Sequence, residues 1–490
     1  MKSKLLPAAA GGLLLGLAPP ASAMADSLDA ANNGVLGESV PVNTMWVVIS
    51  AVLVLFMLAG LLSLEAGMSR MKNVGTLVPK ALIGMAVAAF VYYACGFAFA
   101  FGNGEIIGHN GFFLRDYGDP QEAFGIMGLS DALVESKWLF QFAFCAVCLA
   151  IVWGSTLERI KFHAHAIFAL VFAGFIYPLA SHWVFGGGWL QTNVGMQDFA
   201  GSTAVHLVGA TGALAALLIL GPRRGRYGAD GTPRPIPGHS MYILGLGMFI
   251  LLIGWFGFNA GSTLGITDGR FAEVAMVTML GAAGGILGAY FATVVFQRTV
   301  DIGMVCNGLI AGLVAITAPS GYVENWAAPI IGIVGGLLVV PCIIAIDKKV
   351  DDPVGVLSAH GAAGIWGTLA CGLFTAPRFA QYAGVGNPEG GLVYSGSFQQ
   401  LGDQALGVVV VFALVLTLCL ITWYAISKTI GLRVTEEQEI AGLDISEHGM
   451  YGYPEQFIPD AELYGSPAAA SVKLNGSTPA TAGSAEAAPA

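Results

Sequence analysis

The sequence predicts an all-α polytopic membrane protein: eleven transmembrane helices, arranged as two inverted five-helix repeats and a bracing C-terminal helix. Three observations lead to this prediction: a composition poor in charge, a motif that occurs twice, and an uneven distribution of basic residues. Of 490 residues, 56% are hydrophobic and 11% are charged, and the mean hydropathy is +0.72. Soluble domains carry about 25% charged residues, so most of this chain is expected to lie in a bilayer.

The repeated motif is Asp-x-x-Gly-x-x-x-x-His. It runs from Asp198 to His206 and again from Asp352 to His360, and each copy leads into an apolar stretch rich in small residues. Each histidine is therefore expected a turn or two inside a transmembrane helix. Ionisable groups at membrane depth are costly and usually line a pathway or a site. The pair thus predicts two imidazoles that face each other across a pore.

The first 25 residues have the pattern of a secretory signal peptide. Two lysines precede an apolar run over residues 5–17, and small residues follow, with a cleavage site near Ala23 or Ala25. The run is too short to cross a bilayer. A removed signal peptide over 1–25 would place the mature N-terminus outside a bacterial inner membrane.

Eleven apolar stretches after this segment are long enough to be membrane spans. They are 42–64, 77–101, 137–157, 163–185, 199–220, 239–260, 272–296, 302–318, 326–346, 355–374 and 402–426. The histidine motifs begin the fifth and the tenth, so the repeat unit is five helices, and an odd number inverts the topology of the second copy. Inverted repeats with a site near the midplane are a recurring transporter design. Each histidine lies eight residues past its aspartate, about 12 Å of helix, so both can reach a similar central depth.

Basic residues alternate between the loops as this topology requires. The loops expected inside hold Arg70, Lys72, Arg159, Lys161, Arg223, Arg224, Arg226, Arg234, Arg298, Lys348 and Lys349, and Lys428 and Arg433 follow the last span. The longer outward loops hold only Arg115, Lys137, Arg270 and Arg378. This positive-inside pattern predicts an outer N-terminus and a cytoplasmic C-terminus.

The remaining segments add no second domain. Residues 428–465 are polar and are expected to form a cytoplasmic regulatory tail, and the Ala/Ser/Pro/Gly-rich end, 466–490, is expected to be disordered. All seven cysteines fall in apolar stretches, which favours small buried hydrophobes over disulfides or zinc ligands. Neither histidine helix offers a third metal ligand, so no metal or cofactor is expected.

An aromatic cluster, Gly254-Trp-Phe-Gly-Phe-Asn-Ala-Gly-Ser262, ends the sixth span on its outer side. Two interpretations stay open: an interfacial aromatic belt, or a cation site in which ring faces attract a small cation and Ser262 accepts a hydrogen bond. Two stacked phenylalanines above the histidines would form a constriction that penalises a bare charge. Asp198 also has two candidate roles, as a helix cap or as indirect electrostatic support for a cation, whereas Asp352 is expected to be a cap.

Four motifs together resemble the ammonium transporter family (Amt/Mep/Rh), over about residues 42 to 450. They are Asp198-Phe-Ala-Gly-Ser-Thr-Ala-Val-His206, Gly254-Trp-Phe-Gly-Phe-Asn-Ala-Gly-Ser262, Asp351-Asp352-Pro…His360-Gly361 and Gly431-Leu-Arg-Val…Glu-Glu-Gln-Glu…Gly-Leu-Asp…His448-Gly449. The resemblance implies a transporter membrane domain over 42–427 and no enzymatic activity. It also implies a homotrimer with one pore per subunit, ammonium or methylammonium as substrate, and no nucleic-acid partner. A PII-type signalling protein at the cytoplasmic face is the partner that the family suggests.

The resemblance also assigns roles by position. His206 and His360 correspond to the family's twin pore histidines, and Phe144 and Phe258 to its gate. Outer substrate-recruitment positions are Ser262, Asp198, Phe185, Gln141 and Trp255. Phe185 is a departure, because many members have a tryptophan there, and Trp183 or Trp189 are candidate substitutes.

The expected function is therefore ammonium uptake. NH4+ is held outside by aromatic faces, loses its proton near the gate, and passes the histidines as NH3. An ammonium sensor and an Rh-like neutral gas channel stay open as alternatives, and so does net proton transfer by a separate route. A membrane enzyme is disfavoured because no nucleophile, metal set or redox motif accompanies the histidines.

Overall fold

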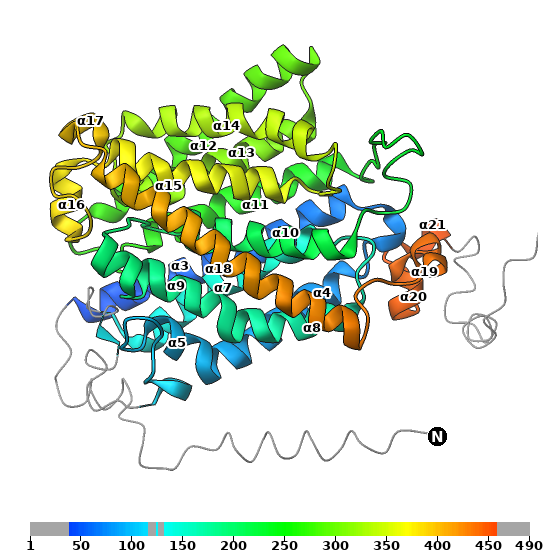
Figure 1. The fold of residues 1–490 in the computed structure, drawn as a ribbon, viewed down its shortest axis with the longest axis horizontal. Helices are drawn as coiled ribbons and strands as arrows, with labels where there is room; N and C mark the ends of the chain where they lie inside the picture. The colour runs from blue at the N-terminus through cyan, green and yellow to red at the C-terminus, as the bar shows by residue number, and fades with distance from the viewer. Residues whose placement is uncertain (1–38, 116–123, 126–131, 458–490) are drawn as a thin grey trace, which may run out of the picture.

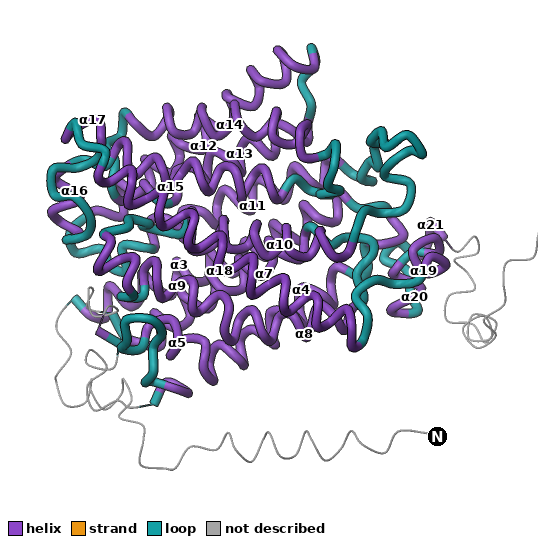
Figure 2. The backbone as a smooth tube through the Cα atoms, in the orientation of Figure 1, coloured by secondary structure: helices purple, strands orange, loops and turns teal. Residues whose placement is uncertain are grey.

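The computed structural model describes residues 39–115, 124–125 and 132–457. The expected signal peptide, the end of the expected tail beyond residue 457 and the low-complexity segment 466–490 lie outside these residues. Among the described residues the regular structure is helical throughout, with isolated bridges and no strand (Figure 2). The predicted all-α class is confirmed.

Nine helical stretches of the described chain are long and apolar enough to cross a membrane. They contain α3 (Val40–Met68), α4 (Leu77–Val91) with α5 (Phe97–Phe101), α7 (Val134–Gly154), α8 (Phe162–Val171) with α9 (Tyr177–Phe185), α10 (Val208–Leu220), α11 (Met241–Trp255), α12 (Arg270–Gln297), α14 (Ala327–Ile346) and α18 (Gln399–Thr429). At the two other predicted spans lie the shorter apolar helix α13 (Ile302–Thr317) and a π-helical turn, Leu357–Ala362, that continues into α15 (Ala363–Phe374). The count of eleven spans stays a prediction.

Helix contacts follow the same order in the two halves of the bundle. In the first half, α3 packs on α7, α4 on α8, and α7 on α10. In the second half, the helices at the corresponding places pair in the same way: α11 with α13, α12 with α14, and α13 with α15.

The last long helix, α18, runs diagonally across these elements (Figure 1) and contacts both α10 and α15. Its Trp423 ring stacks on Phe168 of α8 with 3.8 Å between ring centroids. The Trp423 indole also donates a hydrogen bond to the carbonyl of Gly212 at 3.3 Å. A single helix thus holds the two elements that carry the histidine motifs.

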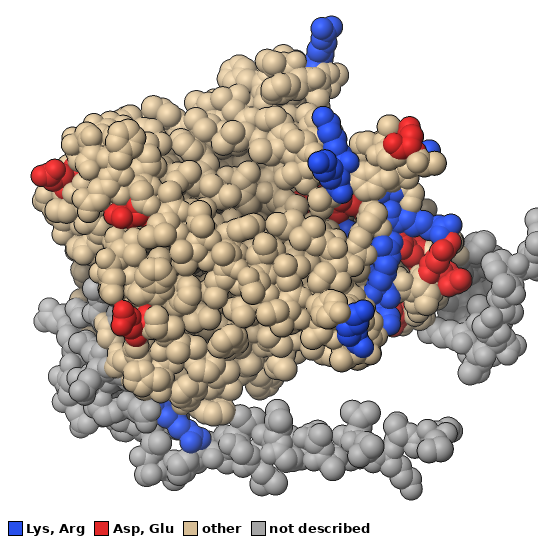
Figure 3. All heavy atoms as spheres, in the orientation of Figure 1, with Lys and Arg blue, Asp and Glu red and all other residues tan. Residues whose placement is uncertain are grey.

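The bundle has two chemically different ends. The short helices α19 (Glu436–Ala441), α20 (Leu443–His448) and α21 (Pro454–Phe457) lie at one, called here the tail end, and α16 (Pro377–Ala383) and α17 (Leu392–Ser395) lie at the opposite end (Figure 1). On the face drawn in Figure 3, most Lys and Arg side chains gather at the tail end, and the belt between the two ends carries no charge. This is the charge distribution that a membrane-spanning bundle requires.

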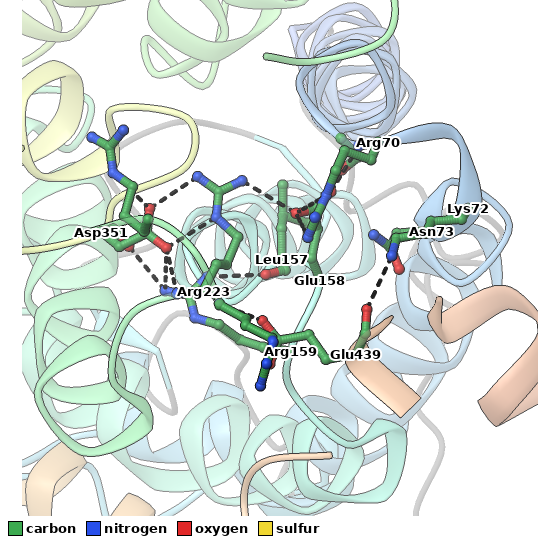
Figure 4. Close-up of polar contacts among 12 residues, drawn as sticks. Arg70, Lys72, Asn73, Leu157, Glu158, Arg159, Arg223, Asp351 and Glu439 are labelled. Carbon is green, nitrogen blue, oxygen red and sulfur yellow. Dashed lines mark hydrogen bonds and ion pairs between the residues drawn. The ribbon is translucent and has the colours of Figure 1, made fainter. Parts of the chain in front are cut away.

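A buried ionic cluster closes the tail end (Figure 4). Asp351 accepts hydrogen bonds from the backbone N–H, Nε and Nη2 of Arg223 at 2.7, 2.9 and 2.9 Å. Glu158 accepts from the backbone N–H and Nε of Arg70 and pairs with Arg223 at 3.3 Å. Burial opposes ionisation of Asp351, but the hydrogen bonds from Arg223 and the charges of Arg159 and Arg223 outweigh it and lower its pKa.

The tail docks against the same end of its own chain. Asp444 accepts the backbone N–H groups of Gly75 and Thr76 at 2.9 and 2.8 Å, where α4 begins. Lys72 donates to the carbonyl of Glu439, whose carboxylate accepts the N–H of Arg224. Polar contacts therefore fix the tail directly on the loops that enter the membrane helices.

Glycines set the spacing of α12, α13 and α14. A Cβ on Gly285 of α12 would lie 2.3 Å from the carbonyl oxygen of Gly308 and 2.5 Å from the Cα of Gly312, both on α13. On the α14 side, a Cβ on Gly336 would lie 2.1 Å from the carbonyl oxygen of Gly285. Since helices in lipid associate through close packing of small residues, this three-helix contact depends on Gly285.

We expect Gly285→Leu to push α12 away from both neighbours and to destabilise the protein by about 3 kcal/mol or more, because overpacked backbone contacts do not relax easily. Thermal unfolding in detergent, followed by tryptophan fluorescence, measures the loss. Gly402→Leu on α18 is the matched control, because a Cβ there meets no atom within 4 Å. Equal melting temperatures for the two variants would contradict the packing argument.

Asp351→Asn should destabilise the chain by about 3 kcal/mol, because it removes the closer of the two carboxylates that neutralise the buried Arg223 guanidinium and leaves only Glu158, at 3.3 Å. The pKa of Asp351 is lower in the folded protein than in the unfolded chain, where it is about 3.9. Its carboxylate therefore stabilises the fold fully above about pH 3.9, and this stabilisation is lost as the pH falls through the pKa of the folded state. The melting temperature of the Asp351→Asn variant should therefore lie below that of wild type by the largest amount at pH 7, and this difference should shrink below about pH 4. Asp230→Asn, at an exposed position, is the control. A difference that persists in acid would contradict the ionic explanation.

Candidate functional site

The two motif histidines meet in the interior of the bundle. His206 lies in the π-helical turn Ser202–Leu207 and His360 in the corresponding turn Leu357–Ala362. Their Nδ1 atoms are 3.2 Å apart, with 5.2 Å between the ring centroids, and both rings are buried. At this distance one Nδ1 donates to the other, so the two imidazoles share a proton. Single π-turns of this kind occur frequently at functional sites.

The start of each motif explains how the rings are held. Gly201 and Gly355 have φ values of +116° and +79°, which L side chains rarely adopt, and each lets the chain turn into its helix. The Asp198 carboxylate accepts four backbone N–H bonds, from Gly201 and Ser202 on one oxygen and from Thr203 and Ala204 on the other, at 2.7–3.0 Å. It caps the helix that carries His206. Asp352 accepts the N–H of Leu357 at 2.7 Å in the same way.

Aromatic rings extend the histidine pair into a continuous stack. Phe144 and Phe258 are stacked with 4.0 Å between centroids and 16° between planes. Phe258 lies 5.4 Å from the ring of His206, and Trp255 lies 5.1 Å from it. The sequence-predicted gate pair and twin histidines are therefore brought together in one column.

A cavity of about 730 Å³ reaches this column from the end of the bundle where α16 lies. Phe144 is one of its lining residues. Predicted recruitment residues on its wall are Gln141, Phe185, Asp198 and Ser262. Trp255 is not among the lining residues; it lies deeper, beside His206, and its indole donates to the Thr317 hydroxyl at 2.9 Å. Ser262 donates its own hydrogen to the carbonyl of Phe258 at 2.8 Å, which leaves its oxygen free to accept.

Neither candidate substitute for the missing tryptophan lines the cavity. The Trp183 indole donates to the carbonyl of Ile106 at 2.7 Å, and its ring packs edge-on against Trp189 at 5.6 Å. Phe185 does line the cavity, with its ring stacked parallel to Phe101 at 6.3 Å. The aromatic wall at this position is a phenyl face, which attracts cations more weakly than an indole does.

Sequence reasoning missed the opposite wall of the cavity. It includes Asp268, Arg270, Tyr322, Tyr382 and Asp403. The Tyr382 hydroxyl binds Asp268, and the Arg270 guanidinium lies 4.8 Å from the Tyr382 ring centroid. Asp268 and Tyr322 lie in loops, whereas Arg270, Tyr382 and Asp403 belong to α12, α16 and α18. No motif links these residues. The only available signal was Arg270, one of few basic residues in the outward loops.

Taken together, the fold and the site define a polytopic helical membrane protein whose cavity leads through a ring stack to a buried histidine pair. The chain belongs to the Ammonium Transporter Family, whose model matches residues 45–453. It is 39% identical to the ammonium transporter Amt2 of Archaeoglobus fulgidus over 435 residues, which cover 86% of this chain and 90% of that protein. It is 33% identical to ammonium transporter 1 member 3 of Solanum lycopersicum, over 86% of this chain and 96% of that one.

Two solved structures show the same fold. A protein described as a sensor Amt protein aligns with a TM-score of 0.75 and 32% identity, over 83% of this chain and 98% of that one. Mep2 of Candida albicans aligns with a TM-score of 0.76 and 29% identity, over 87% of this chain and 93% of that one.

Because Asp198 accepts four backbone N–H groups, Asp198→Asn should be costly. The amide keeps one acceptor oxygen and turns an NH2 group toward two N–H donors, so we expect a loss of about 2 kcal/mol in the free energy of unfolding. Thermal unfolding in detergent measures it. Asp403→Asn, which removes another cavity carboxylate without a helix to cap, should stay within about 0.5 kcal/mol of wild type. If the two variants melt alike, the capping role is wrong.

Proposed function

We propose that this protein carries ammonium across a bacterial inner membrane. NH4+ is held in the outer cavity, loses its proton near Phe144 and Phe258, and passes His206 and His360 as NH3. A continuous series of contacts supports this proposal most. Phe144 lines the cavity and stacks on Phe258, Phe258 lies against His206, and His206 contacts His360.

The outer cavity offers what a small cation needs before it is desolvated. The ring faces of Phe144 and Phe185 attract a cation, and the Ser262 oxygen accepts one N–H of the ammonium ion. Asp198 acts at longer range, because both of its oxygens are already occupied by backbone N–H groups. Both roles considered for Asp198 then apply at once: it caps the helix and adds negative potential to the cavity.

The stacked gate accounts for selectivity. Rings only 4.0 Å apart leave no room between them, so passage requires Phe144 and Phe258 to separate. Bringing an ion with its charge into so apolar an environment is very costly. Ammonium avoids that cost by giving up a proton, whereas K+ and Na+ have none to give.

Below the gate, the histidine pair offers hydrogen bonds to a neutral molecule. Two imidazoles that share one proton present both donor and acceptor nitrogen atoms. The Nε2 atom of His206 is buried without a hydrogen-bond partner in the described part of the chain, so it is available to ammonia.

The orientation that we propose places the tail end in the cytoplasm and the N-terminus outside. The concentration of Lys and Arg at the tail end supports this. The matched helix contacts of the two halves support the inverted five-helix repeat. From its family we further propose that the protein is a homotrimer with one pore in each subunit. A PII-type protein is the candidate partner at the cytoplasmic face.

One rival function has a specific observation in its favour, the structural likeness to a protein described as a sensor Amt protein. In that case ammonium binding in the same cavity would be reported through the tail. An Rh-like neutral gas channel is the other rival. Uptake of a charged amine separates transport from both.

We expect cells that lack their own ammonium transporters to accumulate labelled methylammonium when they express this chain. The double variant His206→Ala plus His360→Ala should lower the initial rate by about tenfold or more, or about 1.4 kcal/mol in the barrier, because the substrate loses its hydrogen bonds in the apolar passage. His163→Ala, at an exposed position, is the control. No uptake by wild type would favour the sensor or the gas channel, and wild-type rates in the double variant would reject the histidine path.

A further inference from the structure

The outer cavity is far larger than an ammonium ion. Its volume is about 730 Å³, whereas a water molecule, which is close to ammonium in size, takes up about 30 Å³ of the liquid. Pockets that bind small organic molecules have volumes of about 300–1,000 Å³. The cavity therefore has room for an organic ligand as well as for NH4+.

The side of the cavity nearest the gate carries a buried acceptor that the chain does not use. Gln141 lies one turn before Phe144 on α7, lines the cavity and is 6% exposed. Its Oε1 has no hydrogen-bond partner in the described part of the chain. A buried amide oxygen without a partner is costly, so this atom indicates a ligand that donates a hydrogen bond. Gln141, Ser262 and the ring of Phe144 are called here the gate-side pole.

A free carboxylate lies on the opposite wall. Asp403 of α18 lines the cavity, is half-buried, and makes no hydrogen bond or ion pair with any residue that the structure describes. The other two lining aspartates are occupied. Asp198 accepts four backbone N–H groups. Asp268 accepts the backbone N–H of Arg270 at 3.0 Å and the hydroxyl of Tyr382. Asp403 is therefore the carboxylate left available for a cation.

The position of Asp403 is set by its neighbours on α18. Gln404 donates to the backbone carbonyl of Gln197 at 2.6 Å and accepts its N–H at 2.7 Å. Gln400 donates to the carbonyl of Gly195, another lining residue, at 3.0 Å. These bonds tie the first turns of α18 to the chain beside the cavity. Sites carried by such anchored helices hold their geometry better than sites on loops.

We propose that the outer cavity binds a linear aliphatic diamine, with one ammonium group at the gate-side pole and the other on Asp403. The first group donates to Gln141 and Ser262 and faces the Phe144 ring. The second forms a charge-assisted hydrogen bond with the Asp403 carboxylate. The methylene chain packs on aromatic rings such as that of Tyr322, which lines the same cavity.

Such a ligand would occupy the cavity without crossing the gate. A diamine carries two charges, and each would have to be given up before the molecule entered the apolar passage. It would therefore block ammonium entry. The inference rests on the proposed function for the gate-side cation site, and it adds Asp403 and a second class of ligand.

The test is calorimetric titration of the purified full chain in detergent at pH 7. The ligands are diamines from ethylenediamine to hexamethylenediamine, each compared with the monoamine of the same carbon number. One chain length should match the separation of the two poles and bind about tenfold or more tightly than its monoamine, because it gains a charge-assisted bond. Equal affinities for diamines and monoamines at every length would overturn the proposal.

Two variants of Asp403 test the geometry. Asp403→Asn should remove the advantage of the diamine and leave monoamine affinity within about twofold of wild type. Asp403→Glu reaches one methylene further, so the best ligand should become a shorter diamine. Asp230→Asn, at an exposed position outside the cavity, is the control. If Asp403→Asn weakened monoamines and diamines equally, Asp403 would act only as a distant charge, and the proposal would be wrong.

An uptake assay connects this binding to the transport path. The best diamine should lower the initial rate of methylammonium uptake by wild type, and the same concentration should have a much smaller effect on Asp403→Asn. A diamine that binds but does not slow uptake would contradict its placement in the cavity. Because titration measures binding without transport, a wild type that takes up no methylammonium would contradict the proposed function alone.

Discussion

The architecture depends on one constraint: a polar group inside an apolar bundle must find its partners within the chain. Asp198 shows how this is met. Its carboxylate takes four N–H groups of the turn that follows, and that turn presents His206 to His360. Without such a cap, the start of the helix would leave several donors unsatisfied in the interior. A group that stabilises the fold thereby also sets the position of the imidazole on which the proposed function rests.

The same constraint governs the tail end. Arginine and carboxylate side chains pair in a buried cluster around Arg223 and Asp351, and the tail docks beside it through Asp444 and Glu439. The tail therefore contacts the loop from which α4 begins and the loop that follows α10. If the tail docked differently, the first contacts to change would be those at the start of α4, one turn from Lys80. This gives the expected regulatory tail a physical route to the interior of its own subunit.

Residues whose partners are close in sequence could be predicted. The repeated Asp-to-His spacing predicted both histidine turns, because capping and helix geometry act over a few residues. The family resemblance added Phe144, and the structure stacks its ring on Phe258. Trp255 was expected in the outer recruitment site but lies beside His206, because its depth depends on how α11 packs against its neighbours.

Residues whose roles depend on distant contacts could not be predicted. Glu65 stands near a helix end, where the sequence does not distinguish a solvated carboxylate from a buried one. Only the packing of α3, α4, α7 and α8 encloses it with Lys80. The cavity wall likewise brings together Arg270 of α12 and Tyr382 of α16, which are more than a hundred residues apart, and no local pattern marks it.

The glycine contacts of α12, α13 and α14 have a mechanical consequence. Backbones in direct contact have no intervening side chains that could rotate to absorb a displacement, so these three helices must move as one rigid slab. Large rocking motions within the second half of the bundle are then disfavoured. The proposed passage would instead open by rotation of individual rings such as those of Phe144 and Phe258. Ring flips are small and fast compared with domain motions, so the passage in such a molecule can open without a global change of shape.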